Sequence, residues 1–285
     1  KFLPSFIKRF PSFRSSNPMR KYQGQLVHQS FDEEGIIEIV ESEGVRALHF
    51  GSSSRQSSML LTDPDQLHSL YARAMMAWLL FKDAPGDVLM IGLGGGSLAK
   101  FLLQRFEDCK IKVVEYRRGV VKIARSHFDL PLDSRLKIKI GDGGHYIRQK
   151  SLTASESYDL LIIDAFDHEG MSDSIGGEAF FDGCKTLLKP DGMLIINLWG
   201  TDKALFQDVA WHLGRVFDWR LLFLPVRGRG NVIGFAFNDP MPLPTQKELR
   251  GRTQALENNY HLEFPVFLQD LKRNNRTLFN RIIKP

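Results

Sequence analysis

The sequence predicts an α/β protein with a seven-stranded, mostly parallel sheet and a small β-sheet before it. From about residue 87 onward, apolar runs alternate with helix-like segments, an alternation typical of a parallel sheet covered by helices on both faces. The last two apolar runs, Trp219–Leu224 and Val232–Phe237, are too close together for a helical crossover, so we expect an antiparallel final hairpin. Before residue 62, short alternating runs separated by glycines indicate an antiparallel sheet.

Each element follows from its local pattern. Strands of the small sheet are expected at Ile36–Val40, Val45–Phe50 and Ser58–Leu61. Asp63 and Pro64 then predict the start of a helix, and apolar residues at helical spacing carry it to about Phe81. The parallel strands are expected at Val88–Ile91, Ile111–Glu115, Leu136–Ile140, Tyr158–Asp164 and Met193–Leu198. Helices are expected between them at Ser97–Phe106, Arg118–Ser126, Gly177–Leu188 and Asp202–Val216.

This reading divides the chain of 285 residues into four parts. Residues 1–22 form a basic arm, because six lysines and arginines precede the first acidic residue, Asp32. The small β domain covers 23–62, the α/β domain 63–240, and a helical extension 241–285. With 43% hydrophobic and 25% charged residues, the chain has enough apolar material for one large core.

Composition also excludes several classes of protein. The two cysteines, Cys109 and Cys184, are far apart and form no CxxC or metal-binding pattern, so we expect reduced thiols, a cytoplasmic location and no bound metal. There is no run of 18 apolar residues, and so no transmembrane span is expected. The net charge of +5 is concentrated near the two ends, and we interpret the basic arm as a solvated extension rather than a nucleic-acid or membrane contact.

Acidic residues and glycines follow the predicted parallel strands one after another. Gly92–Gly96 follow the first strand, Glu115 ends the second, Asp142 follows the third, and Asp164 and Asp167 follow the fourth. Ligands of open α/β sheets bind beyond the carboxyl ends of the strands, and these residues are therefore expected to share one crevice.

The chemistry of these residues suits an adenosine that carries a positive charge. Glu115 can accept two hydrogen bonds from a ribose diol. Asp142 can accept one from an exocyclic amine such as that of adenine, and the neighbouring Gly143 lets the base come close to the backbone. The glycine-rich segment lacks the lysine of a phosphate-binding loop, which favours S-adenosylmethionine (AdoMet) or a relative over a nucleoside triphosphate. The carboxylates Asp164 and Asp167 suit a sulfonium donor and an ammonium acceptor, and either can take a proton from an attacking amine.

These residues resemble the spermidine synthase family of aminopropyltransferases, from about Ile36 to Phe237. The best matches are the pair Asp164-Ala-Phe-Asp167, the following stretch Glu178–Gly192, the strand end Val114–Val121 and the turn Gly141-Asp-Gly143. The resemblance implies the AdoMet-dependent transferase (Rossmann-like) fold, a homodimer formed through the N-terminal sheet, and decarboxylated AdoMet with a putrescine-like amine as substrates.

The resemblance also implies a role for each site residue. Asp164 is expected to be the catalytic carboxylate, with Asp167 as its partner and as a ligand of the amine acceptor. Tyr71 falls near family positions that contact the amine. The donor's adenosine is expected to contact Gly92, Gly94, Gly95, Gly96, Glu115, Asp142, Gly143 and, across an alignment gap, Gln56.

The sequence departs from the family pattern mainly on the acceptor and donor-tail side. Gly95 stands where the family has an acidic residue that grips the aminopropyl amine and repels the carboxylate of intact AdoMet. Arg227 and Arg229 replace a segment that helps to hold the diamine, and they would repel a polyamine if they faced the cleft. His168 stands after the second carboxylate in place of a proline.

Three functions therefore remain open from the sequence. The first is aminopropyl transfer, with an altered acceptor site. The second is AdoMet-dependent methyl transfer on the same fold, which Gly95 would tolerate and which an acidic acceptor bound by the arginines would favour. The third is a non-catalytic homologue that binds a thioadenosine and acts as an interaction module.

Overall fold

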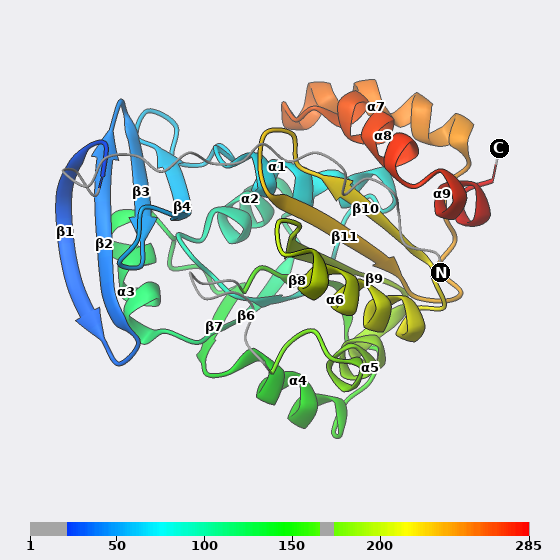
Figure 1. Ribbon diagram of the computed structural model, residues 1–285, viewed down its shortest axis with the longest axis horizontal. Coiled ribbons are helices and arrows are strands. Elements are labelled where there is room, and N and C mark those ends of the chain that lie inside the picture. The colour runs from blue at the N-terminus through cyan, green and yellow to red at the C-terminus, as the bar shows by residue number, and fades with distance from the viewer. Residues whose placement is uncertain (1–21, 166–173, 285) are drawn as a thin grey trace.

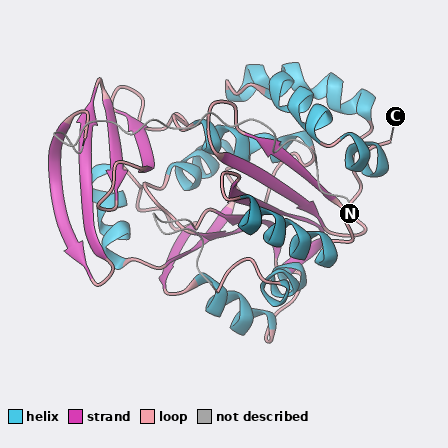
Figure 2. Ribbon diagram, viewed as in Figure 1, coloured by secondary structure: helices cyan, strands magenta, loops and turns pink. Residues whose placement is uncertain are grey.

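The computed structural model describes residues 22–165 and 174–284, which form two sheets of different size (Figures 1 and 2). The smaller sheet is an antiparallel meander whose strands lie in chain order. Its strands are β1 (Gln25–Asp32), β2 (Gly35–Ser42), β3 (Val45–His49) and β4 (Arg55–Leu60).

The larger sheet has seven strands in the order β10-β11-β9-β8-β5-β6-β7. Strands β5 to β9 are parallel to one another, and β11 is antiparallel to both β9 and β10. The predicted fold class is thus confirmed. The strands are β5 (Asp87–Ile91), β6 (Lys110–Glu115), β7 (Leu136–Ile140), β8 (Tyr158–Ile163), β9 (Leu188–Trp199), β10 (Leu221–Pro225) and β11 (Asn231–Phe237).

Helices lie on both sides of this sheet, so its central strands are buried on both faces (Figure 1). This explains their continuous apolar sequences, such as Leu160–Ile163, where every side chain is fully buried. On one side α4, α5 and α6 pack against each other in a row. The connecting helices are α2 (Ser97–Arg105), α3 (Arg118–His127), α4 (Gly143–Ser151), α5 (Glu178–Leu187) and α6 (Lys203–Val216).

The small sheet packs against α3 through a separate apolar cluster that includes Ile37, Ile39, Val120 and Phe128. An ion pair of 2.6 Å between Arg117 and Asp32 joins the same two parts at the edge of this cluster. As a result, β4 lies beside the loop that follows β5, where Ser57 of β4 is close to Gly95.

The helix predicted from Asp63 to Phe81 is wrong at its start. The structure has an α-helix, α1 (Leu70–Met75), that continues as the 3₁₀ helix η1 (Met76–Leu80). The preceding segment is a turn in which the Gln66 amide donates to the Asp63 carbonyl and the Lys100 ammonium donates to the Pro64 carbonyl at 2.6 Å. These tertiary contacts override the local helical pattern.

Three helices follow the large sheet and lie together at one side of it (Figure 1). They are α7 (Gln246–Tyr260), α8 (Phe264–Asn274) and α9 (Arg276–Ile282). A capping box of Thr245 and Glu248 starts α7, and α8 packs on both η1 and β10. Among the described residues no helix is long and apolar enough to cross a membrane. The basic arm falls almost entirely outside the described residues.

Candidate active site

The loop after β5 turns sharply at three glycines, Gly92, Gly94 and Gly96, whose φ angles of 93°, 55° and 78° favour glycine. A Cβ at Gly92 would overlap the carbonyl oxygen of Asp164 at the end of β8. Position 92 therefore requires glycine for two reasons: the backbone has a positive φ, and a side chain would collide with the end of β8. The loop then enters α2 at Gly96, its N-cap.

Glu115 ends β6 with only 7% of its surface exposed. One carboxylate oxygen accepts a hydrogen bond from the Arg117 amide and the other from the Leu93 amide, both at 2.8 Å. Burial raises the pKa of Glu115, and these backbone hydrogen bonds oppose that rise. The Gly94 amide is a third backbone donor. Since an ionised carboxylate offers roughly four lone-pair sites, the group keeps capacity for a further donor such as a ribose hydroxyl.

Asp142 is the N-cap of α4. Its Oδ1 accepts from the His145 amide at 2.6 Å, and its Oδ2 accepts from the Ser174 hydroxyl at 2.9 Å. The next residue, Gly143, has no room for a Cβ, which would overlap Ile91 at the end of β5. The glycine therefore lets the start of α4 approach the glycine loop. The contact of Asp142 with adenine stays a prediction.

Asp164 directly follows β8, and its carboxylate is held by two side-chain donors. The Asn197 amide of β9 donates to Oδ1 at 2.9 Å, and the Tyr71 hydroxyl of α1 is also hydrogen-bonded to the carboxylate. Burial raises the pKa of Asp164 above the ordinary aspartate value, and the two hydrogen bonds oppose that rise. Burial and the nearby Asp164 also raise the pKa of Tyr71, so the phenol stays protonated and able to donate.

Strand β4 forms the wall next to the glycine loop. The carbonyl oxygen of Gln56 lies 3.4 Å from the Tyr71 hydroxyl, and the neighbouring Ser57 lies against Gly95. A Cβ at Gly95 would lie 2.7 Å from the Ser57 hydroxyl oxygen and 2.9 Å from the Phe128 ring. The loop therefore has no space for an acidic side chain at this position.

Two arginines, Arg227 and Arg73, already have carboxylate partners. Arg227, which the sequence indicated as a potential repulsive group, pairs with Asp270 of α8 through two nitrogens at 2.6 and 2.9 Å. Arg73 of α1 pairs with Glu263 at 2.7 Å. Pairing reduces the repulsion that these two side chains would exert on a cationic acceptor.

The structure thus brings Glu115, Asp142 and Asp164 to the same edge of the sheet, around the glycine loop. It places Gln56 and Tyr71 beside them. Asp167 and His168 lie outside the described residues, so the prediction that Asp167 is catalytic and binds the acceptor stays untested.

Sequence reasoning missed two residues of this site, Asn197 and Asn231. Both are buried, and the Asn231 amide donates to the Asn197 carbonyl oxygen at 3.0 Å. The available signal was a lone asparagine in each of two apolar strands, since a buried polar side chain in such a run needs a specific partner.

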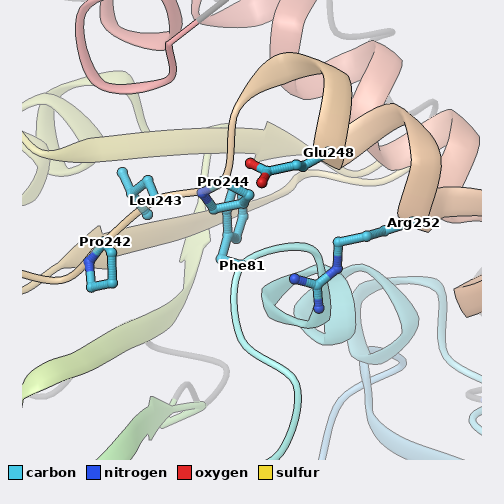
Figure 3. A pocket seen from close by; sticks show the side chains of 6 residues that line it. All are labelled: Phe81, Pro242, Leu243, Pro244, Glu248 and Arg252. Carbon is cyan, nitrogen blue, oxygen red and sulfur yellow. The ribbon is translucent and has the colours of Figure 1, made fainter.

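A separate hollow lies under the start of α7 and is lined by Phe81, Pro242, Leu243, Pro244, Glu248 and Arg252 (Figure 3). Its charged groups already have partners. Glu248 closes the capping box, and Arg252 pairs with Asp83 and donates to the Leu79 carbonyl. No cluster of metal-ligand type occurs among the described residues.

Known proteins are similar to this chain in sequence and in fold. The family model described as spermine/spermidine synthase domain matches residues 69–226. The polyamine aminopropyltransferase of Chromobacterium violaceum is 37% identical over 241 residues, which cover 84% of this chain and 90% of that protein. The human eEF1A lysine and N-terminal methyltransferase is 30% identical over 211 residues, which cover 68% of this chain but 30% of that protein.

Solved structures show the same fold. A spermidine synthase in complex with the transition-state analogue AdoDATO superposes with a TM-score of 0.67 at 19% identity, covering 88% of each chain. Human methyltransferase-like protein 13 in complex with SAH gives a TM-score of 0.60 at 28% identity and covers 68% of this chain and 93% of that one.

Proposed function

Since the chain belongs to the spermine/spermidine synthase family and is a transferase, we propose that it moves an aminopropyl group from decarboxylated AdoMet to a small, putrescine-like amine. The observation that carries this proposal is the half-buried Asp164 carboxylate, held by two donors next to the glycine loop and at the same sheet edge as Glu115. The relatives named polyamine aminopropyltransferase support it.

The proposed reaction is a substitution at carbon. The acceptor nitrogen forms a bond to the aminopropyl carbon next to the sulfonium, the carbon–sulfur bond breaks, and its electron pair neutralises the sulfur. The attacking ammonium must lose a proton, and the raised pKa of Asp164 suits it to accept one. Because Asp164 is half-buried, its negative charge attracts the two cationic reactants more strongly than that of a fully exposed carboxylate would.

On the donor side, Glu115 is proposed to hold the ribose and Asp142 the adenine, with Gly92, Gly94, Gly95, Gly96, Gly143 and Gln56 around the nucleoside. Tyr71 and Asp167 are proposed to contact the acceptor. The backbone hydrogen bonds of Glu115 support its part, because they hold the carboxylate in place and leave room for a further donor. The solved relatives' complexes with SAH and AdoDATO support an AdoMet-like ligand.

Methyl transfer is the second candidate, and a specific observation favours it. The loop has no room for an acidic side chain at Gly95, so nothing at that position repels the carboxylate of intact AdoMet. The eEF1A methyltransferase relatives support the same reading. The third candidate is a non-catalytic thioadenosine-binding protein.

One experiment separates the three candidates. AdoMet and decarboxylated AdoMet are titrated side by side by calorimetry, and each is then incubated with putrescine for product analysis by mass spectrometry. Tighter binding of the decarboxylated donor with an aminopropylated product is the expected result. Tighter binding of AdoMet with a methylated product would replace the proposal by methyl transfer, and nucleoside binding without any product would leave the non-catalytic role.

We further propose a homodimer in the cytoplasm. Strand β1 at the edge of the small sheet exposes apolar side chains, with Leu26, Val27 and Phe31 at 45%, 39% and 72% exposure, and such an edge suits pairing with a second copy. Cys109 and Cys184 are both unpaired and buried, as expected in a reducing compartment. Light scattering after size exclusion tests the dimer, and cell fractionation tests the location.

A further inference from the structure

Three neighbouring strands each place one polar side chain at the same end of the large sheet. Asp164 follows Ile163, which pairs with Ile196 in the parallel register of β8 and β9, so Asp164 comes beside Asn197. In the antiparallel pair of β9 and β11, Asn231 lies opposite Trp199, which makes it a diagonal neighbour of Asn197 on the same face. The sheet order alone therefore lines up Asp164, Asn197 and Asn231.

The hydrogen bonds along this row have a forced direction. An ionised carboxylate can only accept, so the Asn197 amide must point its Nδ2 toward Asp164, as it does at 2.9 Å. The Oδ1 of Asn197 then faces Asn231, and only a donor there can satisfy it. Asn231 supplies that donor through its Nδ2 at 3.0 Å. Both asparagines are buried, at 4% and 7% exposure, so water does not readily replace either bond.

We propose that Asn231 is a positioning residue for the transfer reaction. Its hydrogen bond to Asn197 holds that amide in place, with Nδ2 of Asn197 on the Asp164 carboxylate. Asn231 does not touch Asp164 itself, and it acts through Asn197. This inference rests on the proposed catalytic role of Asp164, but its structural part, the control of the Asp164 environment by Asn231, is measurable without any reaction.

The consequence of losing the donor follows from simple electrostatics. Without a donor at position 231, the buried Oδ1 of Asn197 is left without its hydrogen bond and the Asn197 side chain is no longer held in place. A displaced amide makes a longer and weaker hydrogen bond to the Asp164 carboxylate. This disfavours the charged form of Asp164 and raises its pKa further. The base form is the active one, so the acid limb of the pH–rate profile moves to higher pH.

Other groups around Asp164 do not provide this control. Within the described part of the chain, the titratable side chain that faces Asp164 is Tyr71 of α1, which stays protonated. Strand β5 meets Asp164 through backbone, where the Asp164 amide donates to the Ile91 carbonyl at 2.8 Å. Asn197 is therefore the contact through which a more distant residue can act.

The test replaces Asn231 by leucine, which has a similar size but no donor. The first readout is the titration of Asp164 in the ligand-free protein, followed by NMR of ¹³C-labelled aspartate and assigned with Asp164→Asn. The expected result is titration at higher pH than in the wild type. The second readout is the pH–rate profile, with kcat reduced on the order of three- to tenfold at neutral pH, the equivalent of one neutral hydrogen bond, and KM for the donor unchanged.

Two controls distinguish positioning from a general structural effect. Asn238 is also buried, lies just past the opposite end of β11, and donates to the Lys189 carbonyl at 3.0 Å. Asn238→Leu should lower the free energy of unfolding and leave the pH at which Asp164 titrates unchanged. In an Asn197→Leu background, Asn231→Leu should add no further shift, because the proposed effect passes through Asn197. If Asn231→Leu does not fold, Asn231→Ala takes its place.

The outcomes separate this proposal from the proposed function. An unmoved Asp164 titration in a folded Asn231 variant overturns the positioning role, whatever the enzyme transfers. The positioning role is also overturned if Asn231→Leu shifts the Asp164 titration by the same amount in the wild-type and in the Asn197→Leu background. A shifted titration in a protein that transfers no group supports the positioning role and contradicts the proposed function instead.

Discussion

Replacing Asp164 by asparagine is the most direct test of the proposed chemistry. The substitution removes the charge and the proton acceptor but keeps the shape of the side chain. The Asn197 amide at 2.9 Å can still donate to the remaining oxygen. Tyr71 loses an acceptor on the other side, but the Gln56 carbonyl lies 3.4 Å from its hydroxyl and offers an alternative. The fold is therefore expected to survive the change.

The expected cost falls on the chemical step. A positioned acid or base contributes about 10²–10⁴-fold to rate, so we expect kcat to fall by this factor. It corresponds to about 2.7–5.4 kcal/mol in the activation barrier. Nucleoside binding should change by less than about 0.5 kcal/mol, since Asp164 is not part of the proposed ribose or adenine contacts.

The assay measures aminopropyl transfer at saturating substrates and methylthioadenosine binding by calorimetry on the same preparations. Asp159→Asn is a matched control, because Asp159 is also a poorly exposed carboxylate of β8 but bonds to the Gly86 and Asp87 amides at the opposite end of the strand. It should lose stability and keep kcat. Full turnover by Asp164→Asn would refute the reasoning, because a neutral amide cannot take the proton.

Further predictions concern the donor site and stability. Asp142→Ala should weaken adenosyl-ligand binding by about 1.5–3 kcal/mol by calorimetry, and an unchanged affinity would remove Asp142 from the adenine site. Gly95→Asp should lower the free energy of unfolding by about 1–3 kcal/mol through overlap with Ser57, and Ser57→Ala in the same chain should recover part of it; an undiminished stability would contradict the packing argument. Burial acts to raise the pKa of Asp159, but backbone hydrogen bonds and Lys189 at 3.0 Å outweigh it and lower the pKa overall. Asp159 therefore stabilises the fold above the ordinary aspartate pKa of about 3.9, and this contribution is lost as the pH falls through the lower pKa of the folded state. Urea unfolding over that pH range should show that the free energy of unfolding falls less with decreasing pH in Asp159→Asn than in the wild type.

The sequence alone allowed the fold class to be predicted because the relevant signals are local. An apolar run of strand length, followed by glycines and a helical pattern, marks each parallel unit, and the order of these units places the ends of the strands at one edge. Glu115 and Asp164 could be picked out because each stands at such an end. The start of α1 could not, since the Lys100 bond to the Pro64 carbonyl that shapes the preceding turn comes from a residue far along the chain.

Only the tertiary structure decided which polar groups meet. Asn197 and Asn231 are 34 residues apart, and they touch because β11 inserts between β9 and β10. Likewise, Arg227 finds its carboxylate on α8, in the helical extension. Periodicity in a sequence reports which face of an element is buried, but it carries no information on which distant element covers that face. The acidic residues at the strand ends were therefore predictable from the sequence, whereas the hydrogen-bonded row that holds Asp164 is a product of strand order in the folded sheet.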